Sequence, residues 1–188
     1  MVLGAGWAKQ LNRQRPYLDL EVERIVANKQ GDVFTADARV ASYFSSEPED
    51  ATASVFLEWF SRLKPIGRWR FRQSLRASYT THINRTFNDL LELGDRYGVR
   101  GFRPDSLAGF QRLGFSAETT FFTKWKLLGF KFAPIVFADL AFLDVGNKGL
   151  FYSVPYSGIG AGMRTRNENL TFGTIELRFT YFPKVVED

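Results

Sequence analysis

Polar and apolar residues alternate along most of this chain with a period of two. In residues 68–79, arginine and serine fill all six even positions, while Trp69, Phe71 and other mainly apolar residues fill the odd positions. Successive side chains of a β-strand point to opposite faces, so a strand here has one arginine-rich face and one apolar face. A helix would scatter the same arginines around its axis. The pattern therefore predicts a two-faced strand.

Seven other segments alternate in the same way, the clearest of them near the C-terminus. In residues 173–182, apolar and polar side chains take opposite faces: Ile175, Leu177, Phe179 and Tyr181 on one, and Thr174, Glu176, Arg178 and Thr180 on the other. The sequence therefore predicts an all-β, antiparallel fold of about eight strands. Besides the two segments above, the expected strands are residues 17–26, 33–44, 54–62, 115–122, 131–142 and 157–166.

A period of two fits both a transmembrane β-barrel and a soluble β-sandwich. Strands that span a membrane are about 9–11 residues long, with an apolar side towards lipid and a polar side towards the lumen. Aromatic residues gather near the expected strand ends, and no second set of apolar faces remains to complete a soluble core. The connections also alternate, with short ones at 28–32, 64–67, 124–129 and 167–169 and long ones at 45–51, 84–110 and 144–154. These observations favour a transmembrane barrel.

In that fold, residues 1–188 form one barrel domain whose apolar strand faces contact lipid. No spanning helix is expected, because the longest apolar stretch, residues 127–143, is interrupted by Lys131, Pro134 and Asp139. Residues 1–8 lack the features of a signal peptide, so we expect the exported protein to begin further upstream. The side chains expected to face lipid include Trp69, Phe71, Ile175, Leu177, Phe179 and Tyr181.

Composition excludes several kinds of chemistry. The 188 residues contain no cysteine and one histidine, His82, which removes disulfides, thiolate sites and histidine-rich metal clusters. The net charge is +5, and 16% of the residues are aromatic. Arginines interleaved with aromatics could form a nucleic-acid surface, but their strict alternation favours a lumen wall. There is no GxSxG nucleophile motif, and residues 158–162 lack the ending of a phosphate-binding loop. We expect no enzyme activity, no cofactor, no metal and no nucleic-acid partner.

One short motif carries a resemblance to a known family. Val99, Arg100, Gly101 and Phe102 follow Tyr97-Gly98, and this run resembles the VRGF motif of the BamA-like outer-membrane superfamily. Later segments resemble that family in the same order: residues 114–118 (GFSAE), 137–139 (FAD), 157–164 (SGIGAGMR) and 174–179 (TIELRF). The resemblance covers roughly residues 97–182, and it identifies the chain as similar to the C-terminal part of a barrel domain that includes bacterial surface antigens.

The resemblance implies that the long loop 84–110 folds back into the barrel lumen. Its arginine, Arg100, would then contact acidic residues on the following strands, which correspond here to Glu118 and Asp139. Both acids fall on the polar faces of their strands by the alternation above, and an arginine can bind two carboxylates through charge-assisted hydrogen bonds. The alternative is a surface arginine in a turn, with Glu118 and Asp139 as unrelated lumen charges.

The chain also departs from the family pattern. The family barrel has sixteen strands and is preceded by periplasmic domains, whereas about eight strands are expected here. Five strands follow the motif loop in the family, and four are expected in this chain. We therefore expect either an interior part of a larger barrel or a reduced relative. Open sheet edges are not tolerated in lipid, so the remaining strands of a larger barrel or a second copy would have to cover them.

Three functional hypotheses follow. The first is an outer-membrane barrel of a Gram-negative bacterium that inserts or translocates client outer-membrane or secreted polypeptides, with membrane lipid as its surroundings. The second is a stand-alone eight-stranded barrel with a structural or binding role, in which strand 17–26 pairs with strand 173–182. The third is a soluble β-sandwich that binds a ligand or nucleic acid, with the Ile175, Leu177 and Phe179 face inside.

Overall fold

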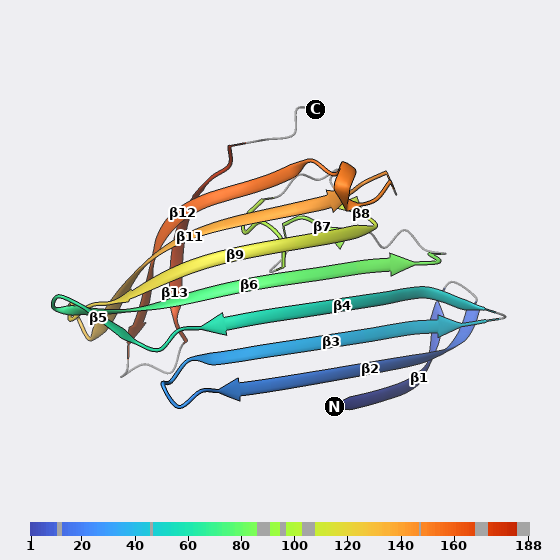
Figure 1. The fold of residues 1–188 in the computed structure, drawn as a ribbon, viewed down its shortest axis with the longest axis horizontal. Coiled ribbons are helices and arrows are strands. Elements are labelled where there is room, and N and C mark those ends of the chain that lie inside the picture. The colour runs from blue at the N-terminus through green and yellow to red at the C-terminus, as the bar shows by residue number, and fades with distance from the viewer. Residues whose placement is uncertain are drawn as a thin grey trace.

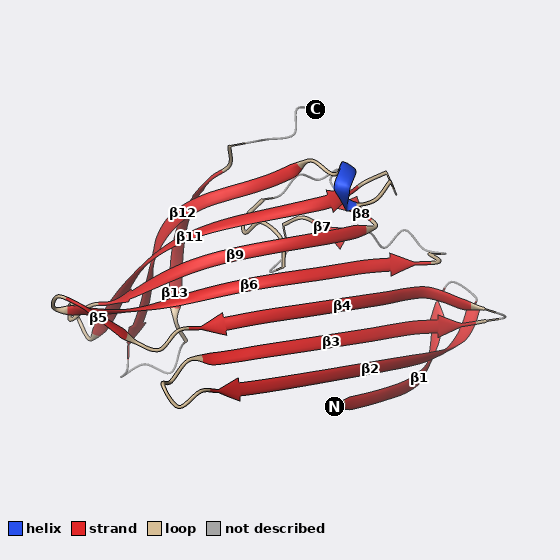
Figure 2. Ribbon diagram, viewed as in Figure 1, coloured by secondary structure: helices blue, strands red, loops and turns tan. Residues whose placement is uncertain are grey.

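One large antiparallel sheet makes up most of the molecule (Figures 1 and 2). The computed structural model describes residues 1–188 except 11–12, 46, 86–90, 95–96, 103–107, 147, 168–172 and 184–188. Within the described residues, nine long strands follow one another across the sheet in chain order. They are β1 (Val2–Gln10), β2 (Arg13–Ala27), β3 (Val33–Phe44), β4 (Pro48–Phe60), β6 (Trp69–Ile83), β9 (Gln111–Phe122), β11 (Phe130–Asp144), β12 (Pro155–Asn167) and β13 (Ile175–Tyr181).

Short elements extend this sheet or lie beside it. Strand β5 (Lys64–Ile66) pairs with β6, and β10 (Lys126–Leu127) pairs with β11, so both lengthen hairpins at the same end of the sheet. Strands β7 (Leu91–Glu92) and β8 (Ala108–Gly109) form a separate two-stranded sheet, and a 3-10 turn, η1, covers Leu150–Tyr152. Among the described residues, there is no helix that is long and apolar enough to cross a membrane.

The all-β antiparallel fold expected from the alternation is confirmed, and all eight expected segments lie largely within strands. The additional long strand is β1, which the sequence pattern did not indicate. Its residues Gly4, Ala5, Gly6 and Ala8 are small and alternate weakly, and glycine and alanine have low strand propensity. The strand forms because it pairs with β2 over its whole length.

Several connections differ from expectation. Strand β4 begins at Pro48, so only residues 45–47 separate it from β3, and the expected long connection 45–51 is wrong. The expected short turns 64–67 and 124–129 contain β5 and β10. The long segment 84–110 contains β7 and β8, while its residues 86–90, 95–96 and 103–107, like 168–169 of another expected turn, lie outside the described residues.

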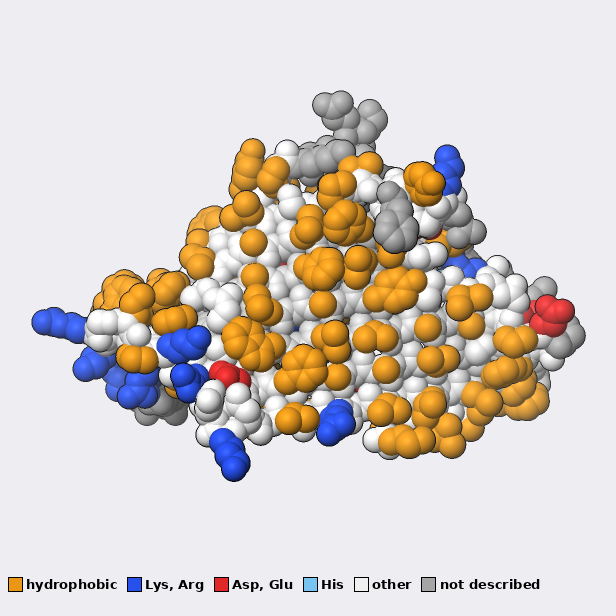
Figure 3. Space-filling model, viewed as in Figure 1, with side chains coloured by type: hydrophobic (Ala, Val, Ile, Leu, Met, Phe, Trp, Pro, Cys, Tyr) orange, Lys and Arg blue, Asp and Glu red, His pale blue; other side chains and the backbone are white. Residues whose placement is uncertain are grey.

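The strand register sorts side chains into two continuous faces. On the apolar face, Ala36, Leu57, Ala77, Phe115 and Leu140 lie directly opposite one another across β3, β4, β6, β9 and β11. Hydrophobic side chains are spread over the part of this face that Figure 3 shows, and Phe179 on β13 is 72% exposed. No second sheet covers the apolar face within the described part of the chain. The sandwich hypothesis, which placed this face in a core, therefore has no structural support.

The polar face carries the charged residues of the same strands. A second ladder runs through Glu58, Arg76, Ser116, Asp139 and Gly158 on β4, β6, β9, β11 and β12. The ladder shows that residues expected on polar strand faces share one side of the sheet. The loop between β6 and β9 packs on this side.

The sheet curves but does not close. In Figure 1, β13 passes behind the ends of β6 and β9, while β1 and β13 remain the two edges. The nine long strands alternate in direction, so the edge strands β1 and β13 run the same way. The pairing of 17–26 with 173–182 expected for a stand-alone barrel is absent, because β2 pairs with β1 and β3, and β13 pairs with β12. A closed barrel is not formed by the described strands alone.

Candidate functional site

The segment from β7 to Phe102 lies against the polar face and brings its own small hydrophobic core. Leu93, Val99 and Phe102 are buried and pack with Ala141 and Leu143 of β11 and with Tyr156 of β12. The ring of Phe102 also contacts the rings of Tyr156 and Phe182, with centroids 5.7 and 5.3 Å apart. These contacts bury apolar surface on an otherwise charged face, and they hold the loop against the sheet.

Two glycines shape the turn that presents Arg100. The amide of Val99 donates a hydrogen bond to the carbonyl of Leu93 at 2.9 Å. A Cβ at Gly98 would overlap that same carbonyl, and Gly101 has a φ of 79°, which L side chains rarely adopt. Glycine at both positions therefore lets the chain reverse beside the sheet with Arg100 at its inner tip.

Arg100 binds both acids that the sequence singled out. Its Nε lies 2.8 Å and its Nη2 2.9 Å from the two carboxylate oxygens of Asp139, and its backbone amide also donates to Asp139 at 3.2 Å. Its Nη1 lies 2.5 Å from Glu118. The side chain of Asp139 is 0% exposed and that of Arg100 9% exposed. The expected contact is therefore present, as a buried, bidentate ion pair with a second carboxylate on the same guanidinium.

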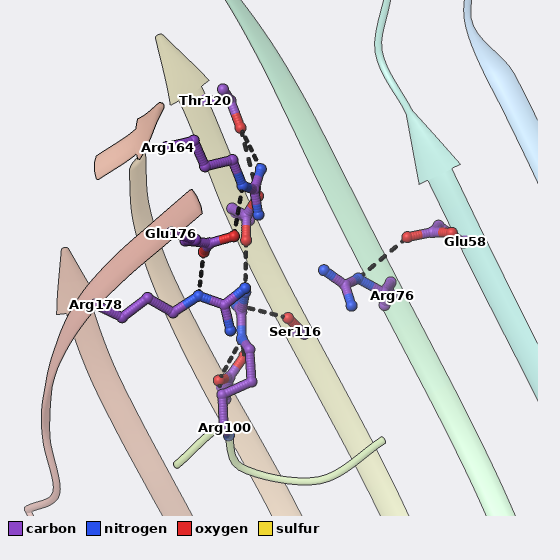
Figure 4. A network of polar contacts seen from close by, with 10 residues as sticks. Glu58, Arg76, Arg100, Ser116, Thr120, Arg164, Glu176 and Arg178 are labelled. Atoms are coloured by element: carbon purple, nitrogen blue, oxygen red, sulfur yellow. Dashed lines mark hydrogen bonds and ion pairs between the residues drawn. The ribbon is translucent and has the colours of Figure 1, made fainter. Parts of the chain in front are cut away.

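The site is larger than the sequence suggested, because Glu118 also binds Arg164 of β12, at 2.7 Å. Arg164 continues to Glu176 of β13 at 2.8 Å, and Glu176 accepts a hydrogen bond from Arg178. Figure 4 shows this chain of alternating charges crossing from the loop to the last strands. It contains three arginines and three carboxylates in the order Asp139, Arg100, Glu118, Arg164, Glu176 and Arg178. The buried charges are thus balanced within the network.

Neutral groups complete the surroundings of Arg100. Ser116 of β9 accepts a hydrogen bond from its Nη2 at 3.0 Å, and the guanidinium lies over the ring of Phe137 at 4.3 Å from the centroid. A planar guanidinium can use its edge for hydrogen bonds and its face for an aromatic ring at the same time, which lysine cannot do. The site is therefore built for arginine and not simply for a positive charge.

Glycines on the strands allow the loop to come this close. A Cβ at Gly114 of β9 would overlap the carbonyl of Tyr97, and one at Gly158 of β12 would press on Val99 at 2.9 Å. The carbonyl of Tyr97 accepts a hydrogen bond from Ser78 of β6 at 2.8 Å. Gly114 and Gly158 therefore lie directly beneath the loop, where a larger residue would collide with it.

The N-terminal part of the segment has a separate attachment. Arg112 of β9 is buried and donates to the carbonyl of Glu92 at 2.5 Å, and the ring of Tyr97 meets that of Phe56 of β4 edge-on, with centroids 5.5 Å apart. The segment thus contacts β4, β6, β9, β11 and β12. It bridges strands from the middle of the sheet to its C-terminal side.

The residues expected to face lipid all lie on the apolar face. Ile175, Leu177, Phe179 and Tyr181 are exposed along the edge strand β13, Trp69 is exposed at the start of β6, and Phe71 is half-buried beside Phe121. The sequence did not assign roles to Arg164, Glu176 or Arg178 in the network. Alternation placed Glu176 and Arg178 on a polar face, but only the pairing of β12 with β13 puts Glu176 opposite Arg164.

The arrangement holds opposite charges in place between the loop and the strands. The described residues contain no group of histidine, cysteine and carboxylate side chains that could hold a metal ion. His82 lies at the far end of β6, opposite Thr52 of β4, and its backbone amide donates to Phe110. The contacts of the site join the loop to strands β9 and β11. No family model, no curated protein and no solved structure matches this chain.

Proposed function

We propose that this chain is part of the wall of a transmembrane β-barrel in a bacterial outer membrane, of the BamA-like type, and that it takes part in inserting or translocating polypeptides there. The observation that carries the proposal is that two features occur together in one sheet, one on each face. One face is a continuous, exposed apolar surface, and the opposite face holds an inward-folded loop by the buried contact of Arg100 with Asp139 and Glu118.

The apolar face supports a membrane setting. Soluble monomers rarely expose continuous apolar patches larger than a few hundred Å², and this face extends over the nine long strands of the described sheet. Lipid can cover such a face without forming hydrogen bonds, because the strands inside the sheet pair with a neighbour on each side. The apolar face is therefore suited to contact with lipid.

The polar face supports a lumen. Its charges would be costly in a dry core, but those around Arg100 form ion pairs, and they face the side on which the loop folds in. In the low-dielectric wall of a barrel, an arginine held by two carboxylates makes a strong link between the loop and strands β9 and β11. The proposed role of the link is to keep the loop inside the lumen, where it supports the strands near the C-terminal edge β13.

The open edges support a larger assembly. Edge strands β1 and β13 run in the same direction, so joining them directly would make a parallel seam in an otherwise antiparallel sheet. Closing an all-antiparallel barrel on these nine strands needs an odd number of further strands. Seven would reach the sixteen that the resemblance implies. The proposal is therefore a barrel completed by strands other than the nine described.

The test is assembly of a client barrel by the full-length protein in liposomes. A denatured outer-membrane barrel is added, and its conversion to a protease-protected, heat-modifiable form is followed with time. We expect wild-type liposomes to accelerate this conversion over empty liposomes. R100A should lose most of the acceleration, whereas R39A, which removes a half-exposed arginine bound to Asp19 on the same face, should retain it.

Three outcomes would count against the proposal or against one part of it. If the embedded protein gives the same client assembly as empty liposomes, the chain is a barrel with a different role, such as the structural or binding function of the second hypothesis. If the protein partitions into water without detergent, the membrane assignment itself is wrong. Equal loss of activity in R100A and R39A would remove the Arg100 contact from the mechanism while leaving the membrane assignment intact.

A further inference from the structure

The polar face contains a hollow of about 400 Å³ beside the Arg100 network, which we call the polar-face hollow. Its walls include polar-face residues of β6, β9, β11 and β12. Glu118 and Arg164, which bind each other in the network, both line it. Figure 4 shows Arg164 beside Thr120, another wall residue. The hollow is therefore next to the contacts that hold the loop, but it is a separate space.

Ser74 of β6 places a buried polar group in this hollow. The residue is 6% exposed, and the register sets it directly opposite Glu118 of β9 and Phe60 of β4. Its hydroxyl has no hydrogen-bond partner among the described residues. A buried hydroxyl without a partner is costly, and such groups in native structures usually meet a bound water or ligand. The hydroxyl is therefore a donor for a group that binds in the hollow.

Two arginines supply the hollow with positive charge. Arg72 of β6 and Arg166 of β12 line it and are exposed, and their side chains form no ion pair or hydrogen bond with the described residues. Lys131 lines the hollow too but already has a partner, so the available charge is that of the two arginines. The acid among the described wall residues is Glu118, and both of its oxygens are bound by arginines of the network. The hollow therefore favours a negatively charged occupant.

Aromatic rings lie beside these polar groups. Phe60 of β4 and Phe122 of β9 belong to the walls of the hollow, and Phe122 is 41% exposed. A small inorganic anion would leave the rings in contact with water, whereas an anion attached to an apolar body would cover them. The walls therefore fit an oxyanion that is carried by a larger, partly apolar molecule.

The position of the hollow distinguishes a polypeptide from a lipid. Arg72, Ser74 and Arg166 lie on the polar face of the sheet, on the same side as Asp139 and the loop. In the proposed barrel this side is the lumen, and phospholipids contact the opposite face. The larger molecule that reaches the lumen is a polypeptide in transit, and aspartate and glutamate are its oxyanions. Arginine binds such carboxylates through charge-assisted hydrogen bonds.

We propose that the polar-face hollow binds an acidic side chain of the polypeptide that the barrel inserts or translocates. This inference rests on the proposed function and adds to it a chemical preference among clients. Arg72 and Arg166 attract the carboxylate, the Ser74 hydroxyl donates a hydrogen bond to it, and an apolar neighbour in the client covers Phe60 and Phe122. Salt weakens the binding, because both arginines are exposed.

The experiment measures peptide binding to the full-length protein in detergent micelles. The probes are two short peptides with a neutral fluorophore, one of aspartate, leucine and serine repeats and the other with asparagine in place of aspartate. Fluorescence anisotropy gives the dissociation constant of each. We expect the aspartate peptide to bind more tightly. R72Q/R166Q should lower this preference by about fivefold, as is typical of exposed ion pairs.

S74A separates ligand binding from folding. The hydroxyl has no partner among the residues that the structure describes, so its removal breaks no hydrogen bond there, and the midpoint of denaturant unfolding should not fall. The affinity for the aspartate peptide should nevertheless decrease by about tenfold, as expected for the loss of a hydrogen bond to a charged group. Unchanged affinity in S74A would contradict the role of this hydroxyl in the site.

R24Q/R68Q is the matched control. It removes two exposed arginines that do not line the hollow, and it should leave the preference for the aspartate peptide unchanged. Equal binding of the two peptides by the wild type overturns the proposal, and so does a loss of preference in R24Q/R68Q as large as that in R72Q/R166Q. Tighter binding of glycerol phosphate than of the aspartate peptide also overturns it, in favour of a phosphate headgroup.

Client assembly in liposomes tests the proposed function separately. Acceleration of assembly by a wild-type protein that does not distinguish the two peptides refutes this inference and leaves the function standing. A clear preference for the aspartate peptide without any acceleration refutes the function and leaves the hollow as a polypeptide-binding site.

Discussion

At the scale of single residues, Arg100 is the position on which the loop depends most. Arginine is usually exposed to solvent, but Arg100 is almost completely buried. Its backbone amide and three guanidinium nitrogens donate hydrogen bonds, and the face of its guanidinium lies over an aromatic ring. The carboxylates of Asp139 and Glu118 are buried against it. Burying a charge is tolerable only when it is paired, so each member of this contact requires the others.

The first prediction concerns the stability of this contact. R100A leaves two buried carboxylates, one of them without its principal partner, and we expect a loss of about 3–5 kcal/mol in the free energy of unfolding. R100K keeps the positive charge but loses the planar guanidinium and its several N–H donors. Its free energy of unfolding should therefore lie between those of R100A and wild type. R39A removes a half-exposed pair and should cost at most about 1 kcal/mol. Denaturant unfolding in detergent measures all three, and equal, small losses in R100A and R39A would contradict the assigned role.

At the scale of elements, the loop and the strands fit because of small residues on both sides. Gly98 lets the loop turn on itself, while Gly114 and Gly158 leave room on β9 and β12. Glycine weakens a strand, so its presence in the middle of two long strands has a packing reason here. The reason is that the backbone of the loop lies close to the backbone of the sheet. The hydrogen bond from the Ser78 hydroxyl to the carbonyl of Tyr97 is one of the contacts at this place.

The second prediction follows from that packing. G114A places a methyl group on the carbonyl of Tyr97, so the loop must shift, at a cost of about 1–3 kcal/mol typical of overpacking. Hydrogen exchange at the amides of Val99 and Phe102, which close the turn, should become faster. G6A is the matched control, because nothing lies within 4 Å of a Cβ added there. Unchanged exchange in G114A would mean that the loop does not rest on β9.

At the scale of the whole molecule, the sheet is wide, curved and open. Its two edges are the strands β1 and β13, and both present unpaired backbone groups. Exposed edges are sites where further strands add, and in lipid they have to be covered. The two edge strands run in the same direction because the number of long strands is odd. Only an odd number of further strands could therefore join them in an antiparallel barrel.

The third prediction tests whether the edges meet each other. The chain has no cysteine, so introduced pairs can be joined by a short thiol crosslinker without background. A5C/L18C, whose Cα atoms are register partners on β1 and β2, should crosslink within one chain. A5C/F179C, which joins the edges β1 and β13, should not. An intrachain crosslink of similar yield in A5C/F179C would show a barrel closed by a parallel seam, and the requirement for further strands would be withdrawn.

Much of this structure was predictable because alternation is a local property. The segments 68–79 and 173–182 reveal strands and their faces without reference to any other part of the chain. The placement of Glu118 and Asp139 on polar faces follows from the same rule, and with the VRGF resemblance it pointed to their contact with Arg100. The sequence therefore determined the fold class, the two faces of the sheet and the centre of the loop site.

Only the tertiary structure decided what depends on pairing between distant strands. Strand β1 forms because it pairs with β2, although its small residues do not predict a strand from the sequence alone. The register of β12 and β13 adds Arg164, Glu176 and Arg178 to the network, and the register at the β10 end sets Lys126 opposite Lys131. The physical reason is that a strand's alternation fixes which face a side chain takes, whereas its neighbours and its offset against them are fixed by hydrogen bonding and packing across the whole sheet.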